Sequence, residues 1–135
     1  MKYFVNEITA DKWIGVKTDD EVIATPTVDD LHRVIEALDA DVKTSVFLKG
    51  ENGAYMAIGG GLGKYVVFVS PSDQKFWNLI AREGATNETV SIVIGGQEGD
   101  YPARQVVDKN AAMKAAESFF SQGERDPSLH WELQK

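Results

Sequence analysis

Two segments of the chain carry apolar residues at helical spacing. In residues 28–38 they fall on one face of a helix: Leu31, Val34, Ile35 and Leu38. Thr27 is a suitable N-cap for this helix, and acidic residues occupy its first turn. A second helix is predicted after Asp108, with an alanine- and phenylalanine-rich buried stripe, and Gly123 stands where a helix commonly ends in a left-handed residue. Beyond it, we expect Trp131 to anchor the tail to the core.

Between residues 43 and 94 the pattern changes to short runs of β-branched and aromatic residues, which indicate strands. The main runs are 45–48, 54–58, 65–69, 76–80 and 89–94. Asn52-Gly53 predicts a hairpin between the first two runs, and the turn residues 70–73 predict an antiparallel connection between the next two. Gly95-Gly96 ends the last run. Shorter extended pieces are expected in residues 3–8, 21–24 and 104–107.

The order of these elements predicts an α+β domain: an antiparallel sheet of about five or six strands with two main helices packed on it. With 135 residues and 43% hydrophobic residues, the chain can bury one core, so we expect a single domain spanning residues 1–135. No apolar run approaches the roughly 20 residues that cross a membrane. The start of the chain lacks an apolar signal segment and there are no cysteines, both of which fit a cytoplasmic protein.

The formal net charge of −7 changes the list of possible partners. It argues against direct binding of nucleic acid, because a phosphate backbone requires clustered Lys and Arg. An acidic surface suits either a basic protein partner or solubility alone, and the sequence leaves both open.

The stretch "IGGGLGK", residues 58–64, superficially resembles a phosphate-binding loop. A Walker A loop would place its first glycine at Ile58 and a Ser or Thr at Tyr65, and neither is present. Both that loop and the dinucleotide fingerprint also require a helix to follow, whereas residues 65–69 have the pattern of a strand. We therefore predict that these glycines serve a bulge, a positive φ angle or a close approach between backbones.

Catalytic and metal-binding patterns are weak. There is no Cys, and His32 and His130 are isolated, so we predict neither a metal site nor a cofactor. The acidic runs lack the spacing of a calcium loop. No serine or threonine is recognisably placed beside a base, and no carboxylate pair is identifiable. We do not expect an enzyme.

The segment from Gly95 to Arg104 is the most distinctive one left. It combines carboxylates with glycines, which permit unusual backbone angles. It also contains a tyrosine and an arginine, two residue types that are frequent binding anchors. As candidate partner-binding residues we select Gln97, Glu98, Asp100, Tyr101 and Arg104. The alternative is a structural loop in which Arg104 pairs with Glu98 or Asp100.

Two long segments carry a family resemblance: "GGGLGKYVVFVSPSD" and "GGQEGDYPARQVVDKNAAMKAAESFFSQGERDPSLHWE". Together, from Gly59 to Glu132, they resemble the immunity-protein family found beside deaminase toxins in bacterial polymorphic toxin systems, the first of the numbered immunity series, which includes inhibitors of DddA-like cytosine deaminases. The resemblance implies a non-enzymatic cytoplasmic protein that binds its cognate toxin and protects nucleic acid in the producing cell.

Two other readings stay open at this point. One is a non-catalytic adaptor of the same fold, and the other is a small-ligand-binding domain, since glycine loops can line a pocket. Edge strands would permit a homo-oligomer, although nothing in the sequence specifies one. The identity of the toxin and the face that contacts it are likewise left open.

Overall fold

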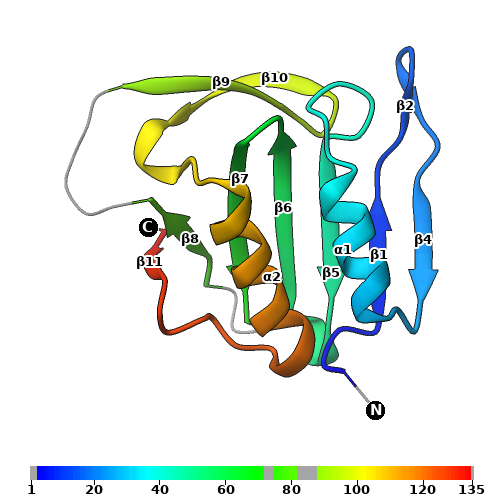
Figure 1. The fold of residues 1–135 in the computed structure, drawn as a ribbon, viewed down its shortest axis with the longest axis vertical. Coiled ribbons are helices and arrows are strands. Elements are labelled where there is room, and N and C mark those ends of the chain that lie inside the picture. Colours follow the sequence, from blue (N-terminus) through cyan, green and yellow to red (C-terminus); the bar gives the residue numbers. More distant parts are fainter. Residues whose placement is uncertain (1–2, 72–74, 82–87, 135) are drawn as a thin grey trace.

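The computed structural model describes residues 3–71, 75–81 and 88–134 (Figure 1). Its helices are α1 (Val28–Glu36) and α2 (Lys109–Gln122), with short 3-10 turns η1 (Glu51–Gly53) and η2 (Ala103–Gln105). Its strands are β1 (Glu7–Ala10), β2 (Trp13–Ile14), β3 (Lys17–Thr18), β4 (Glu21–Ala24), β5 (Ser45–Lys49), β6 (Tyr55–Gly61), β7 (Lys64–Ser70), β8 (Trp77–Ile80), β9 (Thr89–Ile94), β10 (Gln97–Pro102) and β11 (His130–Leu133).

The main sheet has the strand order β11-β8-β7-β6-β5-β1-β4, and every neighbouring pair is antiparallel. Both helices lie on the same face of it (Figure 1). The predicted α+β class is confirmed. The described part of the sheet contains seven strands rather than five or six, because the tail forms β11, which pairs with β8 at one edge, while β1 and β4 extend the other edge.

Both helices begin where their capping residues predict, and α2 also ends as predicted. Thr27 and Asp30 form a reciprocal capping box at the start of α1, with N–O distances of 2.9 and 3.1 Å. Asp108 caps α2 by accepting a hydrogen bond from the amide of Ala111 at 2.8 Å. Gly123 ends α2 with φ at +72°. Helix α1 ends at Glu36, two residues before the predicted limit.

The core lies between the helices and one face of the sheet. Alternate residues of the central strands point toward the helices and are completely or almost completely buried, among them Val46, Leu48, Met56, Ile58, Val67 and Val69. Helix α2 presents small alanines and two phenylalanines to them, all fully buried: Ala112, Ala115, Ala116, Phe119 and Phe120. As expected, Trp131 packs against this core, and its indole donates a hydrogen bond to the backbone oxygen of Asp126 at 3.1 Å.

Ion pairs on the helical side are exposed and secondary to this core. Glu36 pairs with Lys109, and His32 with Glu117, each at 2.8 Å, so that α1 and α2 are linked twice. Exposed pairs of this kind contribute little to stability, because water and salt screen them. The His32 side chain is itself 41% exposed, so it lies at the surface.

Two predicted segments differ in the structure. Residues 95–104, expected as a loop, contain strand β10, which pairs with β9 along its whole length. Residues 104–107, expected as a strand, instead contain the end of η2, and Val107 forms a single antiparallel bridge with Tyr65. Pro102 has no amide hydrogen to donate, and the chain turns directly after it. Of the predicted turn 70–73, residues 72 and 73 lie outside the described residues.

Asp11, directly after β1, is a buried carboxylate that joins three parts of the structure. It accepts hydrogen bonds from the amide and hydroxyl of Thr44 at 2.6 and 2.5 Å, from the amide and hydroxyl of Ser45, both at 3.0 Å, and from the indole of Trp13 at 2.8 Å. The hydroxyl of Thr44 in turn accepts a hydrogen bond from the amide of Gly96, at 3.1 Å, in the β9–β10 turn. Burial raises the pKa of Asp11, but the hydrogen bonds from Thr44, Ser45 and Trp13 outweigh it, and the pKa is below its ordinary value.

Replacing Asp11 with Asn should lower the free energy of unfolding at pH 7 by about 2–3 kcal/mol, since several donors lose a charged acceptor. Because the folded pKa is depressed, the carboxylate stabilises the fold above its unfolded pKa of about 4 and this contribution is lost as the pH falls below that value. The difference between wild type and Asp11→Asn should therefore shrink between pH 5 and about pH 2. Urea unfolding across this range tests it, with the exposed Asp100→Asn as control. An equal difference at all pH values would contradict the assignment.

Candidate functional site

The "IGGGLGK" stretch forms the hairpin between β6 and β7. Leu62 and Gly63 are its two turn residues, with φ at +55° and +84°, and β7 begins at the following residue. Two successive positive φ angles are those of a type I′ hairpin turn. The predicted strand directly after these glycines is confirmed, so the helix that a Walker A loop or a dinucleotide fingerprint requires at this point of the chain is replaced by β7.

The glycines of β6 allow the β9–β10 hairpin to lie against the main sheet. A Cβ atom on Gly59 would lie 2.5 Å from Cγ2 of Ile94, and one on Gly60 would lie 2.2 Å from the backbone oxygen of Lys64. Gly60 also has φ at +114°, which residues with a side chain rarely adopt. Gly60 thus shows the predicted positive φ and close backbone approach, to Lys64 of β7, whereas Gly59 makes room for a side chain of β9, which the sequence did not predict.

The hairpin crosses one end of the main sheet (Figure 1). Its register pairs Gly99 with Ile92 and Tyr101 with Val90, and these residues face the sheet. Glu98 and Asp100 are two residues apart in β10 and therefore share the opposite, outer face, where both are exposed. The hairpin is thus apolar toward the sheet and carries two carboxylates toward solvent.

A cavity of about 370 Å³ lies under the hairpin on the face of the sheet that the helices leave open. Its floor is apolar and its polar groups are neutral hydroxyls and amides; the lining includes Ser45, Phe47, Phe68, Asn78, Tyr101 and Gln105. A second hollow of about 490 Å³ continues along the same face and shares Phe47 with the first. We call these two hollows together the open-face groove.

Aromatic rings gather on the open face. Tyr55 lies within 6.1–6.4 Å, centroid to centroid, of three other rings, those of Phe47, Phe68 and Phe76. Phe47 and Phe76 are 38% and 36% exposed, so the cluster is reachable from solvent. Partly exposed aromatic clusters beside a hollow are typical of surfaces that bind other molecules.

The structure separates the five residues that the sequence selected. Gln97, Glu98 and Asp100 are exposed on the hairpin, whereas Tyr101 lines the cavity beneath it. Arg104 follows the hairpin in η2.

Arg104 pairs with Glu132 of β11, not with Glu98 or Asp100 as the alternative reading had it. The reason is that η2 brings Arg104 beside β8, to which β11 is paired: the backbone oxygen of Arg104 accepts a hydrogen bond from the amide of Ala81 at 2.7 Å. Its Nε is buried without a hydrogen-bond partner in the structure.

The groove offers little for chemistry on a substrate. The hydroxyl of Ser45 donates to Asp11, so it is already committed to the fold. His32 pairs with Glu117 and His130 is exposed at the edge strand, and neither lines the cavity. Among the described residues, no three His, Cys, Asp or Glu side chains gather as metal ligands would. Within residues 3–71, 75–81 and 88–134, no helix is long and apolar enough to cross a membrane.

An α+β domain with an acidic hairpin above a cavity of apolar and neutral polar lining suits contact with another protein. The family model described as "Immunity protein Imm1" matches residues 19–133, and the chain therefore belongs to the Imm1 immunity protein family. A search of curated proteins gave no match. Membership assigns the protein an immunity function, which implies binding of a cognate toxin, and such families are generally non-catalytic.

The sequence analysis did not predict a binding surface on the open face, the face of the main sheet that the helices leave uncovered. The signal was available in residues 65–69, where both alternating sets are apolar or aromatic: the core-facing Tyr65, Val67 and Val69, and the opposite Val66 and Phe68. A strand with two apolar faces is covered on both sides or carries a binding surface. The predicted arrangement, a sheet with two helices packed on it, gives the face opposite the helices no role.

Replacing Gly59 with Ala should weaken the packing of the β9–β10 hairpin against β6, because the new methyl group would clash with Ile94. We expect a loss of about 1–3 kcal/mol in the free energy of unfolding, typical of overpacking, and faster hydrogen exchange in residues 89–102. Adding Ile94→Ala should recover part of the loss. Gly63→Ala is the matched control: its Cβ meets nothing within 4 Å, so its positive φ costs stability without loosening the hairpin. Strictly additive effects of Gly59→Ala and Ile94→Ala would contradict this account.

Proposed function

We propose that the protein binds and neutralises a cognate toxin of the deaminase type, which modifies nucleic acid, and so protects the cytoplasm of the cell that makes it. Membership of the Imm1 family carries the proposal. The acidic outer face of the β9–β10 hairpin supports the finer statement about the kind of toxin.

Electrostatic attraction between the protein and its expected partner supports the proposed kind of toxin. A toxin that acts on nucleic acid needs a basic surface to hold phosphates, and that surface attracts a protein of net charge −7. Glu98 and Asp100 are exposed side by side on the hairpin, and within the described chain neither is paired with a Lys or Arg. They are free to meet cationic groups of a partner.

The proposed contact has two parts with different physics. Gln97, Glu98 and Asp100 meet the basic surface of the toxin and speed the encounter. The second part lies beside and beneath the β9–β10 hairpin and consists of Tyr101, Arg104 and the open-face groove. Burial of apolar surface there slows dissociation of the complex. A toxin held in this way has its nucleic-acid-binding surface covered, and no chemistry by the immunity protein is needed.

One observation favours a second candidate, a small-ligand-binding domain. The cavity of about 370 Å³ is within the size range of small-molecule sites, and it has an apolar floor with a few neutral hydrogen-bonding groups. A ligand there would be uncharged and largely apolar, because none of the described residues that line the cavity is charged.

Mixing the purified protein with the toxin domain encoded beside it should give a one-to-one complex in which cytosine deamination is lost. Calorimetry and a deamination assay on the same mixture measure binding and inhibition together. Binding to a toxin that remains active would favour the adaptor alternative. No binding, combined with a rise in Tm on addition of small apolar compounds, would favour the ligand-binding alternative.

Glu98→Gln and Asp100→Asn should each lower the association rate constant and flatten its dependence on salt, while changing the dissociation rate constant little. We expect a decrease of about two- to tenfold at low ionic strength for the pair of substitutions. Stopped-flow measurements at several salt concentrations test this.

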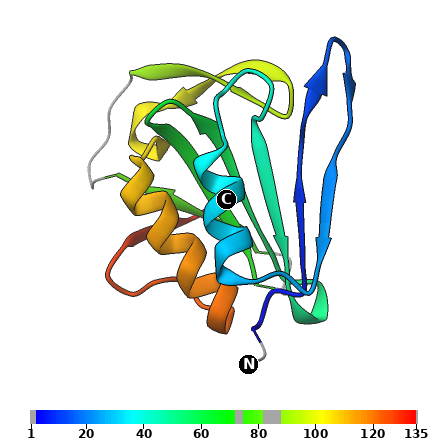
Figure 2. The ribbon, with the colours of Figure 1, turned by 45° about the vertical axis from the view of Figure 1, so that its right-hand side comes forward.

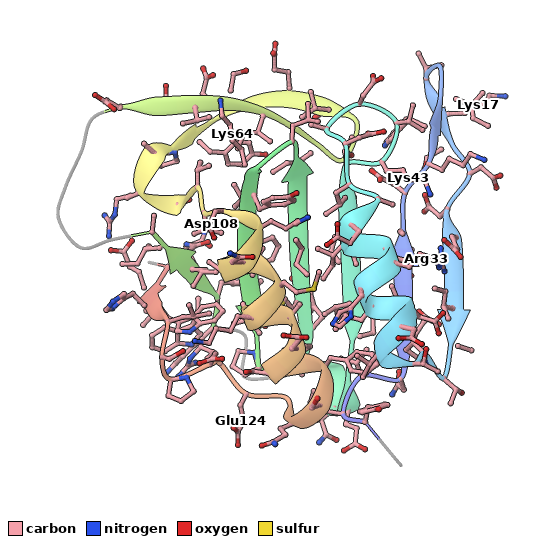
Figure 3. The ribbon with its side chains drawn as sticks, viewed as in Figure 1. Lys17, Arg33, Lys43, Lys64, Asp108 and Glu124 are labelled. Carbon is pink, nitrogen blue, oxygen red and sulfur yellow. The ribbon has the colours of Figure 1, made fainter. Side chains whose placement is uncertain are left out.

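Glu124→Gln is the matched control for these two variants. It removes the same charge from an exposed position at the opposite end of the molecule from the hairpin (Figure 3). If all three single substitutions lower the association rate equally, net charge alone is responsible, and the hairpin has no special part in recognition.

A further inference from the structure

The strands β1 and β4 continue past the edge of the main sheet as the small hairpin β2–β3, which projects beyond the rest of the molecule (Figure 2). Trp13 pairs with Thr18, and Ile14 with Lys17. The two residues between them are Gly15, with φ at +65°, and Val16. Glycine at the first position of a two-residue turn fits the type II′ turn that hairpins favour. We call residues 14–16 the ribbon tip.

The ribbon tip is apolar and almost fully in solvent. The side chain of Val16 is 92% exposed and that of Ile14 is 64% exposed. Turns at hairpin ends are normally polar, since an apolar side chain there gains nothing from folding. An aliphatic pair at the most protruding point of the molecule therefore calls for a reason outside the fold.

The base of this hairpin is firmly held. The indole of Trp13 donates to Asp11 at 2.8 Å, and its amide donates to the backbone oxygen of Val42 at 2.8 Å. Its ring also lies against Gly96, where a Cβ would approach within 2.4 Å. The backbone oxygen of Lys12 accepts a hydrogen bond from the amide of Asp19 at 2.8 Å. Such anchoring presents the tip in a fixed position, which reduces the entropy lost when a partner binds it.

The match to the family model begins at residue 19, directly after β3, so the ribbon tip lies outside the matched residues. The β9–β10 hairpin lies inside it. A protein that must distinguish its own toxin from related toxins needs contact residues that differ from those of its relatives. The ribbon tip combines this position with exposed apolar side chains.

We propose that the ribbon tip inserts Ile14 and Val16 into an apolar cleft of the cognate toxin and determines which toxin is bound. This inference rests on the proposed function. The partner is a folded protein with a cleft wide enough for a two-stranded hairpin. Because both inserted side chains are uncharged aliphatics, the cleft floor is apolar, and the contact is insensitive to salt. It thereby differs from the contact made by Glu98 and Asp100.

The test is the double variant Ile14→Thr, Val16→Ser, measured by biolayer interferometry against a catalytically inactive form of the neighbouring toxin domain. Thr keeps strand propensity and Ser suits the turn, so the hairpin should persist, which circular dichroism and Tm can check. We expect the Kd to rise at least about tenfold, through faster dissociation at unchanged association rate, and equally at low and high salt.

Leu62→Asn provides the matched control. Leu62 is 79% exposed at another two-residue hairpin turn, but inside the family match, and Asn tolerates its positive φ. Its Kd should stay within about twofold of wild type, as is usual for positions outside a binding hot spot. An equal loss in Leu62→Asn would overturn a special role for the ribbon tip.

The remaining outcomes separate this inference from the proposed function. If the double variant binds the toxin as tightly as the wild type does, the ribbon tip has no role in recognition, and the immunity function still holds. If binding depends on the ribbon tip but the toxin is not a deaminase, the role of the ribbon tip is supported and the deaminase assignment is overturned. Absence of wild-type binding overturns both. A wild-type dimer that the double variant converts to a monomer would show that a second copy occupies the tip, and would also overturn the inference.

Discussion

The carboxylate of Asp11 is the point at which the separate parts of this molecule are joined. Through Thr44 and Ser45 it fixes the start of β5 beside the end of β1, and through the hydroxyl of Thr44 it reaches the turn of the β9–β10 hairpin. Through Trp13 it also holds the base of the β2–β3 hairpin. Both proposed contact surfaces therefore take their position from one buried charge, whose cost of burial is offset by the donors around it.

Local signals in the sequence were sufficient for the helices and for most of the strands. Thr27, Asp108 and Gly123 mark helix ends because capping depends on a few neighbouring atoms. The glycines before β7 could be assigned a structural role because the following strand excludes a phosphate loop. Strand β10 and the tail strand β11 were missed, since their residues have little strand propensity and are held by partners distant in the sequence.

The candidate site was only partly predictable for the same reason. The segment around Glu98 was recognisable from its composition, but its division into an outer acidic face and an inner face with Tyr101 depends on pairing with β9. The alternative interpretation pairs Arg104 with the nearby acids Glu98 or Asp100, whereas its partner in the structure, Glu132, is 28 residues away. The ribbon tip gave no composition signal at all. Its significance lies in exposure, which the sequence of one chain does not report.

The close approach at Gly59 also divides the hairpin into residues that evolution can change and residues that it cannot. The inner positions of β9 are matched to the missing side chain of Gly59, so a larger residue on either side displaces the whole hairpin. The outer positions, among them Glu98 and Asp100, meet only solvent. Charges on that face can be exchanged or reversed while the fold is preserved, so the proposed contact can follow a changing toxin without first passing through an unstable intermediate.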